Sequence, residues 1–533
     1  MSNRPFSATT TALTIGEGTF ASRLLGFARD AAIAALVGAG GAGDALLLAF
    51  RIPNAVRQLL AEGAFAYVLV PAYTEQKHAG YGNASRCIRS IGAVLFLLFA
   101  LTALAAYLFA EPLALLLAPG FADAPEIRAL AASLVGPCFV ALPFTAGAAV
   151  FSAALMAEGN VRSPAYSSAL FNAVIIMAAG VAFIVYGTGH ASALYCICWG
   201  VAAAGLAQWL TQARSFSRIG GRLYGPLAPT APEVTRTLRA LPGSFFGIGG
   251  HQANMLAAAF FASFLAEGSV SSLYFAERLL AFPLGIIGAS VGLAALIDLS
   301  SATSAAEQHA LFSSRLTKAM RATLFFALPA AVGVACLATP LTAAIFGRGE
   351  FGAADTARTS AALLAYMFGL PALALTRPLL AACSAIRDTK TPFRSALAAF
   401  AVTILVSAAL LVTNASWAPA LAVSLAAYAN LGLLLYALGK NNSVTRSAFS
   451  LPPSWLVRVL VCNVVMAACV LGYAFLVSSN VAKLGAVPLG VAIYFGAAWC
   501  MRLEESALAE TVAQKIFRNR RNRINERPFR GKE

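Results

Sequence analysis

Charged residues are scarce in this chain. Asp, Glu, Lys and Arg make up only 11% of its 533 residues, whereas soluble domains carry about a quarter. Acidic residues are the scarcer kind, with 22 against 38 basic ones, which leaves a formal net charge of +16. So few ionised groups exclude an ordinary soluble protein, because a water-exposed surface needs many of them.

Several other signals are also missing. The first apolar stretch contains Glu17, Arg23, Arg29 and Asp30, which the core of a cleavable signal peptide would not contain. The glycines at 247–250 lack the lysine and βαβ context of a nucleotide loop, so close helix packing explains them better. The nine cysteines and four histidines show no metal-ligand spacing. We therefore expect no cofactor, no metal, no ATP site and no nucleic-acid partner.

Long apolar runs are what the sequence does contain. It is 59% hydrophobic with a mean hydropathy of +0.76, and the runs recur from end to end at bilayer-spanning length. The sequence thus predicts an all-α polytopic membrane protein. About fourteen transmembrane helices are expected, with centres near residues 25, 60, 98, 143, 175, 200, 250, 285, 330, 370, 403, 425, 468 and 492.

The basic residues predict the orientation. Of the 38 Lys and Arg residues, 28 fall on the N-terminal side of the predicted membrane and six lie inside spans. Only four lie on the opposite side: Arg128, Arg348, Arg358 and Lys483. Because cytoplasmic loops carry the excess of positive charge, both termini are predicted to be cytoplasmic.

An internal repeat predicts two similar halves. Ala153-Ala154-x-x-Ala157 with Arg162-Ser163-Pro164 recurs 228 residues later as Ala381-Ala382-x-x-Ala385 with Lys390-Thr391-Pro392. Chance recurrence in an alanine-rich chain is the alternative interpretation. With the repeat, the predicted organisation is two pseudo-symmetric six-helix lobes around a central cavity, followed by two C-terminal helices. The boundaries are 1–215 and 236–440 for the lobes, 216–235 for a cytoplasmic linker, 441–503 for helices 13 and 14, and 504–533 for a basic tail.

Six arginines lie inside predicted spans: Arg23, Arg29, Arg51, Arg57, Arg278 and Arg377. A charge at bilayer depth costs at least about 2.5–3.5 kcal/mol, so such residues normally face an aqueous cavity or a partner. Arg51 and Arg377 could instead extend to the lipid headgroups from helix ends. Four of the six crowd into the first two spans, which indicates an internal cationic site for an anion.

Helical geometry groups these arginines with other polar residues. One arc of the first span carries Ser22, Arg23, Arg29 and Asp30, and one arc of the second carries Arg51, Asn54, Arg57, Gln58 and Glu62. Asp44 begins the second helix, and Glu277 and Arg278 come early in the eighth span. The planar arginine fork binds phosphate with two parallel hydrogen bonds, so a diphosphate headgroup is the predicted ligand.

Seven motifs resemble the MurJ/MviN family of lipid II flippases. They run in order from about residue 15 to 395: Ser22-Arg-Leu-Leu-Gly-Phe-Ala-Arg-Asp30, Gly43-Asp44, Phe50-Arg-Ile-Pro-Asn54, Ala61-Glu-Gly-Ala-Phe65, Ala118-Pro-Gly-Phe-Ala-Asp123, Tyr274-Phe-Ala-Glu-Arg278 with Phe282-Pro283, and Arg387-Asp-Thr-Lys-Thr-Pro392. The resemblance implies the fold of the multidrug/oligosaccharidyl-lipid/polysaccharide exporter superfamily. It further implies that helices 13 and 14 form a groove for a polyprenyl tail.

The resemblance also assigns roles to residues. The family's essential cavity arginines match Arg23, Arg29, Arg57 and Arg278, and its functional acids and lysines match Asp30, Asp44, Arg51, Glu62, Glu277 and Arg377. Ser22 and Asn54 join the supporting set because they share the two polar arcs. The chain departs from the family pattern where Arg51 and Arg377 replace a common lysine, where Glu277 replaces an aspartate, and at Ile297-Asp298.

The implied function is transport of lipid II, the undecaprenyl-diphosphate-linked disaccharide pentapeptide, to the outer leaflet of the cytoplasmic (inner) membrane for peptidoglycan synthesis. Alternating access is the expected mechanism, with the membrane potential as a driving force and any coupling ion left open. Membrane lipids and cell-wall synthesis enzymes are further candidate partners. The alternatives are a flippase for another polyprenyl-diphosphate oligosaccharide, a drug antiporter, a membrane glycosyltransferase and a non-transporting scaffold.

Overall fold

The computed structural model describes residues 8–61, 64–248, 250–287, 305–386, 388–440 and 452–506. Within these ranges the regular structure is helical throughout, which confirms the all-α fold class. Several predicted features lie outside the described residues: Glu62, Gly249 of the glycine cluster, the Ile297-Asp298 departure, Arg387 of the last family motif, and most of the basic tail.

The chain divides into two compact units. The first comprises Met1–Phe282, Thr342–Tyr366 and Phe393–Ala429, and the second comprises Pro283–Leu341, Met367–Pro392 and Asn430–Glu533. The helices up to residue 287 are α1 (Ala8–Val37), α2 (Gly41–Ala61), α3 (Ala64–His78), α4 (Tyr81–Leu108), α5 (Ala110–Leu117), η1 (Pro119–Asp123), α6 (Pro125–Phe139), α7 (Ala141–Ala157), α8 (Arg162–Tyr186), α9 (Ala191–Arg218), α10 (Pro232–Ile248), α11 (Gly250–Ala262) and α12 (Ser269–Ile287). The later helices are α14 (Ala305–Cys336), α15 (Ala338–Phe346), α16 (Ala353–Ala385), α17 (Lys390–Leu410), η3 (Leu411–Thr413), α18 (Ala418–Lys440), α19 (Pro453–Leu476), α20 (Asn480–Lys483) and α21 (Ala486–Cys500).

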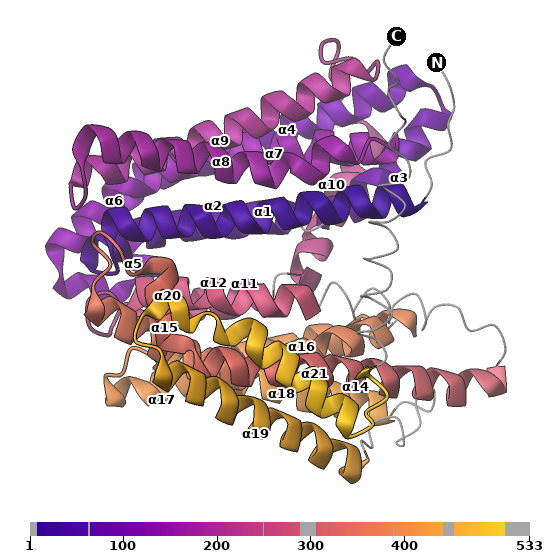
Figure 1. Cartoon of the computed structure of the whole chain (residues 1–533). Coiled ribbons are helices and arrows are strands. Elements are labelled where there is room, and N and C mark those ends of the chain that lie inside the picture. The colour runs from indigo at the N-terminus through magenta and orange to yellow at the C-terminus, as the bar shows by residue number, and fades with distance from the viewer. Residues whose placement is uncertain are drawn as a thin grey trace, which may run out of the picture. The chain divides into compact units, whose positions relative to one another are not determined.

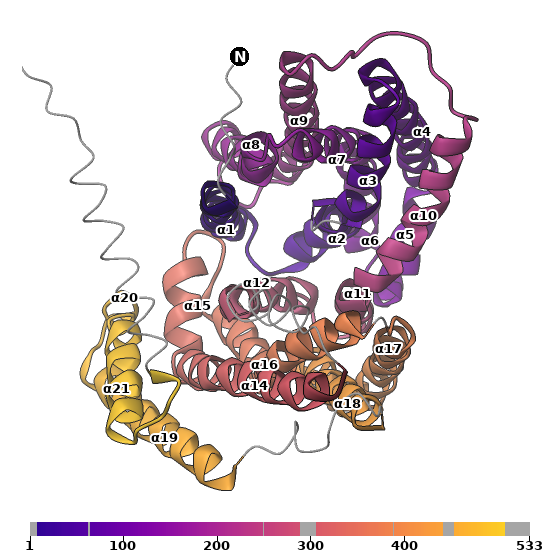
Figure 2. The ribbon, with the colours of Figure 1, turned by 90° about the vertical axis from the view of Figure 1, so that its right-hand side faces the viewer.

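In the first unit, α1, α4, α7, α8 and α9 run side by side (Figures 1 and 2). The tightest packing joins α8 to α9 and α1 to α8, where small residues let the backbones approach. Gly200, for example, lies so close to Ala178 that a Cβ on the glycine would collide with the alanine Cβ. This packing holds α1 and α2, which carry the predicted site, against apolar neighbours.

In the second unit, α19 and α21 pack on each other and both contact α14. The buried Tyr494 on α21 donates a hydrogen bond of 2.8 Å to the carbonyl of Phe325 on α14. Just past α21, Glu505 is buried and accepts from Trp455 at 3.0 Å. The predicted tail boundary at 504 would separate Glu505 from this packing, so the folded part extends at least to Ser506.

Eleven described helical segments are long and apolar enough to cross a membrane. They match eleven of the predicted centres. The three predicted centres without a matching segment are those near residues 25, 60 and 250. The helices described at these places are either more polar, as α1 and α2 are, or short, as α3, α10 and α11 are. The chain is therefore a multi-pass membrane protein, and the count of fourteen stays a prediction.

The internal repeat has a structural counterpart. The first copy ends α7 at Ala157 and begins α8 at Arg162, and the second copy ends α16 at Ala385 and begins α17 at Lys390. Both boundaries keep the offset of 228 residues, so the two copies form the same helix–turn–helix element.

A tight turn separates α1 from α2. Gly38 adopts φ of +69°, where a side chain would be strained and would also collide with the carbonyl of Glu350. The neighbouring Ala39 donates its N–H to Asp355 and accepts from Arg358 at 3.1 Å. This turn is thereby fixed against the start of α16.

Candidate functional site

Arg29 on α1 lies at the centre of a buried polar network in the first unit. Its guanidinium contacts the neighbouring Asp30 at 2.6 Å, and it donates to Asn172 on α8 at 2.9 Å and to the hydroxyl of Tyr274 on α12 at 3.3 Å. Only 3% of Arg29 is exposed. Three helices therefore fix the direction of this guanidinium, which rests over the ring of Phe50.

Arg278 on α12 approaches the same network from another side. Its Nε lies 3.8 Å from Asp30, and its Nη2 lies 3.8 Å from the adjacent Glu277. The guanidinium stacks over the ring of Tyr274, 4.6 Å from the centroid. Because these ion-pair distances are long, Arg278 is held more loosely than Arg29 and can turn towards another anion.

Arg51 on α2 pairs with the carboxylate of Glu277. Its Nη2 donates to Glu277 at 3.1 Å and to the carbonyl of Met255 on α11 at 2.6 Å. Its buried Nη1 makes no hydrogen bond among the residues that the structure describes. Arg51 thus faces inward with a spare donor, and it does not extend to the headgroups, which was the alternative from the sequence.

Arg57 lies two turns further along α2. It donates to Asn54 at 3.1 Å and stacks over the ring of Phe171 on α8, 4.6 Å from the centroid. Asn54 is 3% exposed and Arg57 is 9% exposed. Stacking on an aromatic face stabilises a desolvated guanidinium without neutralising it.

A small pocket opens beside Arg51 and Arg278, and the space of about 250 Å³ around it includes open solvent. Its lining comes from α2, α11 and α12, which run close to one another (Figures 1 and 2). The lining residues are Arg51, Asn54, Ala55, Gln252, Leu256, Tyr274, Glu277 and Arg278. Four of them are site residues predicted from the sequence: Arg51 and Asn54 of the second-span arc, and Glu277 and Arg278 of the eighth span. The structure brings these two groups together.

Three guanidinium groups meet two carboxylates in this network. Within the described residues, Arg29, Arg51 and Arg278 pair with Asp30 and Glu277. The acids hold these guanidinium groups in position, and the three arginines carry one more charge than the two acids. Chemically the arrangement suits a multivalent anion with several acceptor oxygens, such as a diphosphate.

Asp44 lies elsewhere, at the first turn of α2. Its carboxylate accepts from the N–H of Gly268 at 2.7 Å, and from both the N–H and the hydroxyl of Ser271. These donors begin α12, where the helix dipole favours a negative charge. Asp44 therefore fixes the start of the helix that carries Glu277 and Arg278.

Two other predicted site residues are placed less directly. Arg23 lies half-buried on α1, and the carbonyl of Ser22 accepts a hydrogen bond of 2.9 Å from Asn172. Arg377 is exposed and belongs to the second unit, so its part in the site stays a prediction.

Sequence reasoning missed the site roles of Asn172, Gln252 and Tyr274. Asn172 bridges α1 and α8, and Gln252 donates to Gln58 at 2.9 Å. Asn172 was detectable in principle, since it is the one amide side chain in the apolar run from Ala165 to Tyr186. Tyr274 belonged to a quoted motif, yet its contact with Arg29 depends on the tertiary fold.

Comparisons with known proteins agree with this fold. The profile of the family described as lipid II flippase MurJ matches residues 33–496. A probable lipid II flippase MurJ of Rhizobium meliloti is 33% identical over 80% of this chain and 79% of its own length. A lipid II flippase MurJ of Burkholderia cenocepacia is 30% identical over 83% of this chain and 85% of its own.

Solved structures show the same fold. A structure described as lipid II flippase MurJ in an inward closed conformation gives a TM-score of 0.77 at 23% identity, covering 91% of this chain and 98% of that one. An inward-facing multidrug transporter of the MATE family in the MOP superfamily gives 0.61 at 12% identity, covering 78% and 93%. The family profile spans most of the chain, and the motifs around Arg29, Arg51 and Arg278 lie at the buried cluster: this protein belongs to the MurJ family of lipid II flippases.

Proposed function

We propose that this protein moves lipid II from the inner to the outer leaflet of the cytoplasmic membrane, for peptidoglycan synthesis. The observation that carries the proposal is the pocket beside Arg51 and Arg278, in a chain of the lipid II flippase family. A pocket with excess positive charge suits the diphosphate of such a lipid. The relatives named above do not favour the alternative of another polyprenyl-diphosphate oligosaccharide.

The site residues would bind a diphosphate through two kinds of hydrogen-bond donor, one rigid and one able to reorient. Arg29, fixed by Asp30, Asn172 and Tyr274, provides a rigid donor. Arg278 and the Nη1 of Arg51, which makes no hydrogen bond to a described residue, provide donors that can reorient, because their partner Glu277 is shared between them. When a diphosphate binds, it replaces the weaker contacts to Glu277, and water leaves the pocket.

Movement of the headgroup then requires alternating access, with the polyprenyl tail remaining in lipid. In a membrane that is negative inside, outward movement of an anion is favoured by about 2.3 kcal/mol per charge per 100 mV. We propose cytoplasmic termini, two six-helix lobes at 1–215 and 236–440, and a tail groove at helices 13 and 14. Glu62 and Arg377 are included as gate residues, together with Asp44.

The test is complementation in a bacterium whose own flippase can be depleted. Lipid II at the outer surface is measured with a membrane-impermeant binding probe, before and after expression of this protein. The proposal predicts that outer-leaflet lipid II returns on expression. Unchanged accessibility, with the protein present in the membrane at normal amount, would contradict it.

A further inference from the structure

The segment that joins α9 to α10, residues 219–231, has a fixed path although it contains no helix. It runs past the N-terminal end of α4 (Figure 2). Four side chains of α4 hold its backbone: Tyr81 and Arg89 donate to the carbonyls of Ile219 and Arg222 at 3.1 and 2.8 Å, while Ser85 and Ser90 accept from the N–H groups of Arg222 and Ala228 at 3.4 and 2.9 Å. A segment held at four points along its length presents its side chains in a defined way.

Two large apolar side chains of this segment point away from the protein. Tyr224 is 90% exposed and Leu227 is 53% exposed. They flank Gly225 and Pro226, and Gly225 has a φ of +133° that a side chain would not readily adopt. Since the backbone is held while both apolar groups stay outside, the turn is built to present them.

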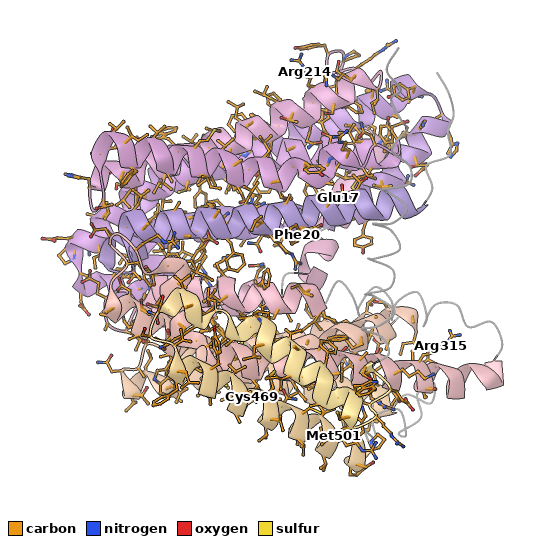
Figure 3. All side chains as sticks on the ribbon, viewed as in Figure 1. Glu17, Phe20, Arg214, Arg315, Cys469 and Met501 are labelled. Carbon is orange, nitrogen blue, oxygen red and sulfur yellow. The ribbon has the colours of Figure 1, made fainter. Side chains whose placement is uncertain are left out.

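Four exposed arginines lie in this segment or on the two helices that adjoin it. Arg86 on α4, Arg214 and Arg218 on the last turns of α9, and Arg222 in the segment are all exposed, and Figure 3 marks Arg214 at the end of α9. Within the described residues none of the four forms an ion pair. Residues 219–231 include no Asp or Glu, and of the acids on the neighbouring helices Glu75 pairs with Arg236 at 2.7 Å. The patch therefore has uncompensated positive charge.

The position of the patch favours a lipid surface over an acidic protein. It continues directly from the ends of two membrane-spanning helices, Tyr81–Leu108 and Ala191–Arg218. An aromatic ring combined with arginines is typical of side chains at headgroup level, where the ring enters the interface and the cations bind lipid phosphates.

We propose that residues 219–231 form an interfacial anchor, in which Tyr224 and Leu227 insert among the headgroups of an anionic leaflet and Arg214, Arg218 and Arg222 bind their phosphates. This inference goes beyond lipid II transport, because it concerns the bulk lipid around the protein. It rests on the orientation in which this end faces the cytoplasmic leaflet. The anchor would hold the ends of α4 and α9 at a fixed depth.

The test uses the full-length protein in nanodiscs with and without an anionic phospholipid. Leu227→Cys carries an environment-sensitive fluorophore, in a background where the exposed Cys469 and Cys500 are alanine. Spin-labelled lipid should quench this probe several-fold more strongly than the same probe at Thr230→Cys, an exposed polar position of the same segment. The difference should be larger with anionic lipid, since each arginine near such a surface strengthens binding by about fivefold.

Two triple variants separate anchoring from a general charge effect. Replacing Arg214, Arg218 and Arg222 by glutamine should remove the dependence on anionic lipid. The control replaces Arg128, Arg348 and Lys483 by glutamine. These three residues carry the same total charge and are predicted to lie on the other side of the membrane. The control should keep the dependence of quenching on anionic lipid. Equal quenching of the probes at 227 and 230 would overturn the proposal. Quenching that still depends on anionic lipid after the first triple substitution would also overturn it. So would protection of the probe only by an added acidic protein.

Discussion

At the residue scale, the site depends on how acids and amides orient arginines. Asn172 and Tyr274 each contact Arg29, so its guanidinium has neighbours on α8 and α12 as well as on its own helix. Arg278 interacts with Tyr274 on its own helix and with Asp30 and Glu277 at 3.8 Å. The two arginines should therefore respond differently to substitution.

Arg29→Lys should reduce transport strongly although the charge remains. Lysine has no planar fork, so it cannot contact Asp30, Asn172 and Tyr274 together. Arg278→Lys should also reduce transport, because the stack on Tyr274 is lost, but by less than Arg29→Lys, because the 3.8 Å ion pairs to Asp30 and Glu277 need only a positive charge. The measurement is initial flipping rate per amount of inserted protein, and equal losses at the two positions would argue against this division of roles.

Asn172→Ala should weaken substrate binding with little loss of protein from the membrane. The variant removes the acceptor that fixes Arg29 Nη1, which leaves the arginine charged but less well oriented. A net hydrogen bond to a charged group contributes about 1.5–3 kcal/mol, so we expect roughly a tenfold or larger rise in the lipid II concentration for half-maximal rate. Asn172→Gln should recover part of the affinity, whereas a purely structural role would lower the protein level in both variants.

At the element scale, helix ends are fixed by single side chains. Asp44→Ala should destabilise the protein by about 2 kcal/mol, because the N–H groups of Gly268 and Ser271 at the start of α12 lose their acceptor. The check is the thermal midpoint in detergent. Asp123→Ala removes an exposed acid instead, and it should leave the midpoint unchanged. If both variants melted alike, Asp44 would not be the fixing residue.

Glu504 and Glu505 provide a second matched pair. Glu505 is buried, accepts from Trp455 and lies 2.8 Å from Arg321, whereas the side chain of Glu504 is 83% exposed. Glu505→Ala leaves Arg321 without its close partner and should lower stability by about 3 kcal/mol, the low end for a broken buried pair. Glu504→Ala should be nearly silent in the same melting experiment. Truncation after Ser506 should likewise be tolerated, and truncation after Leu503 should not.

Some features of the helices could be predicted from the sequence, and others depend on the tertiary fold. Apolar runs predicted eleven spans that the structure contains, because a bilayer demands one length and one composition. The repeat predicted the turns after Ala157 and Ala385. Helical geometry placed Arg51, Asn54 and Arg57 on one face, since these positions share a helix. Their partners on α8, α11 and α12 lie more than a hundred residues away, and only packing brings them together.

At the scale of the whole molecule, the proposed function requires that excess positive charge at the pocket binds the diphosphate of the transported lipid. Arginines that serve only for folding would give a different pattern, in which loss of transport follows loss of protein from the membrane. Separating the two explanations requires a transport measurement that is corrected for inserted protein.

The most direct measurement is outer-leaflet lipid II in depleted cells that express Arg278→Ala or the double variant Arg29→Ala, Arg278→Ala. Arg236→Ala, which removes an exposed arginine paired with Glu75, is the matched control. The account predicts that the double variant inserts but returns little lipid II to the outer surface, while the control behaves as the unaltered protein. A double variant that is well inserted and flips lipid II at the normal rate would contradict it.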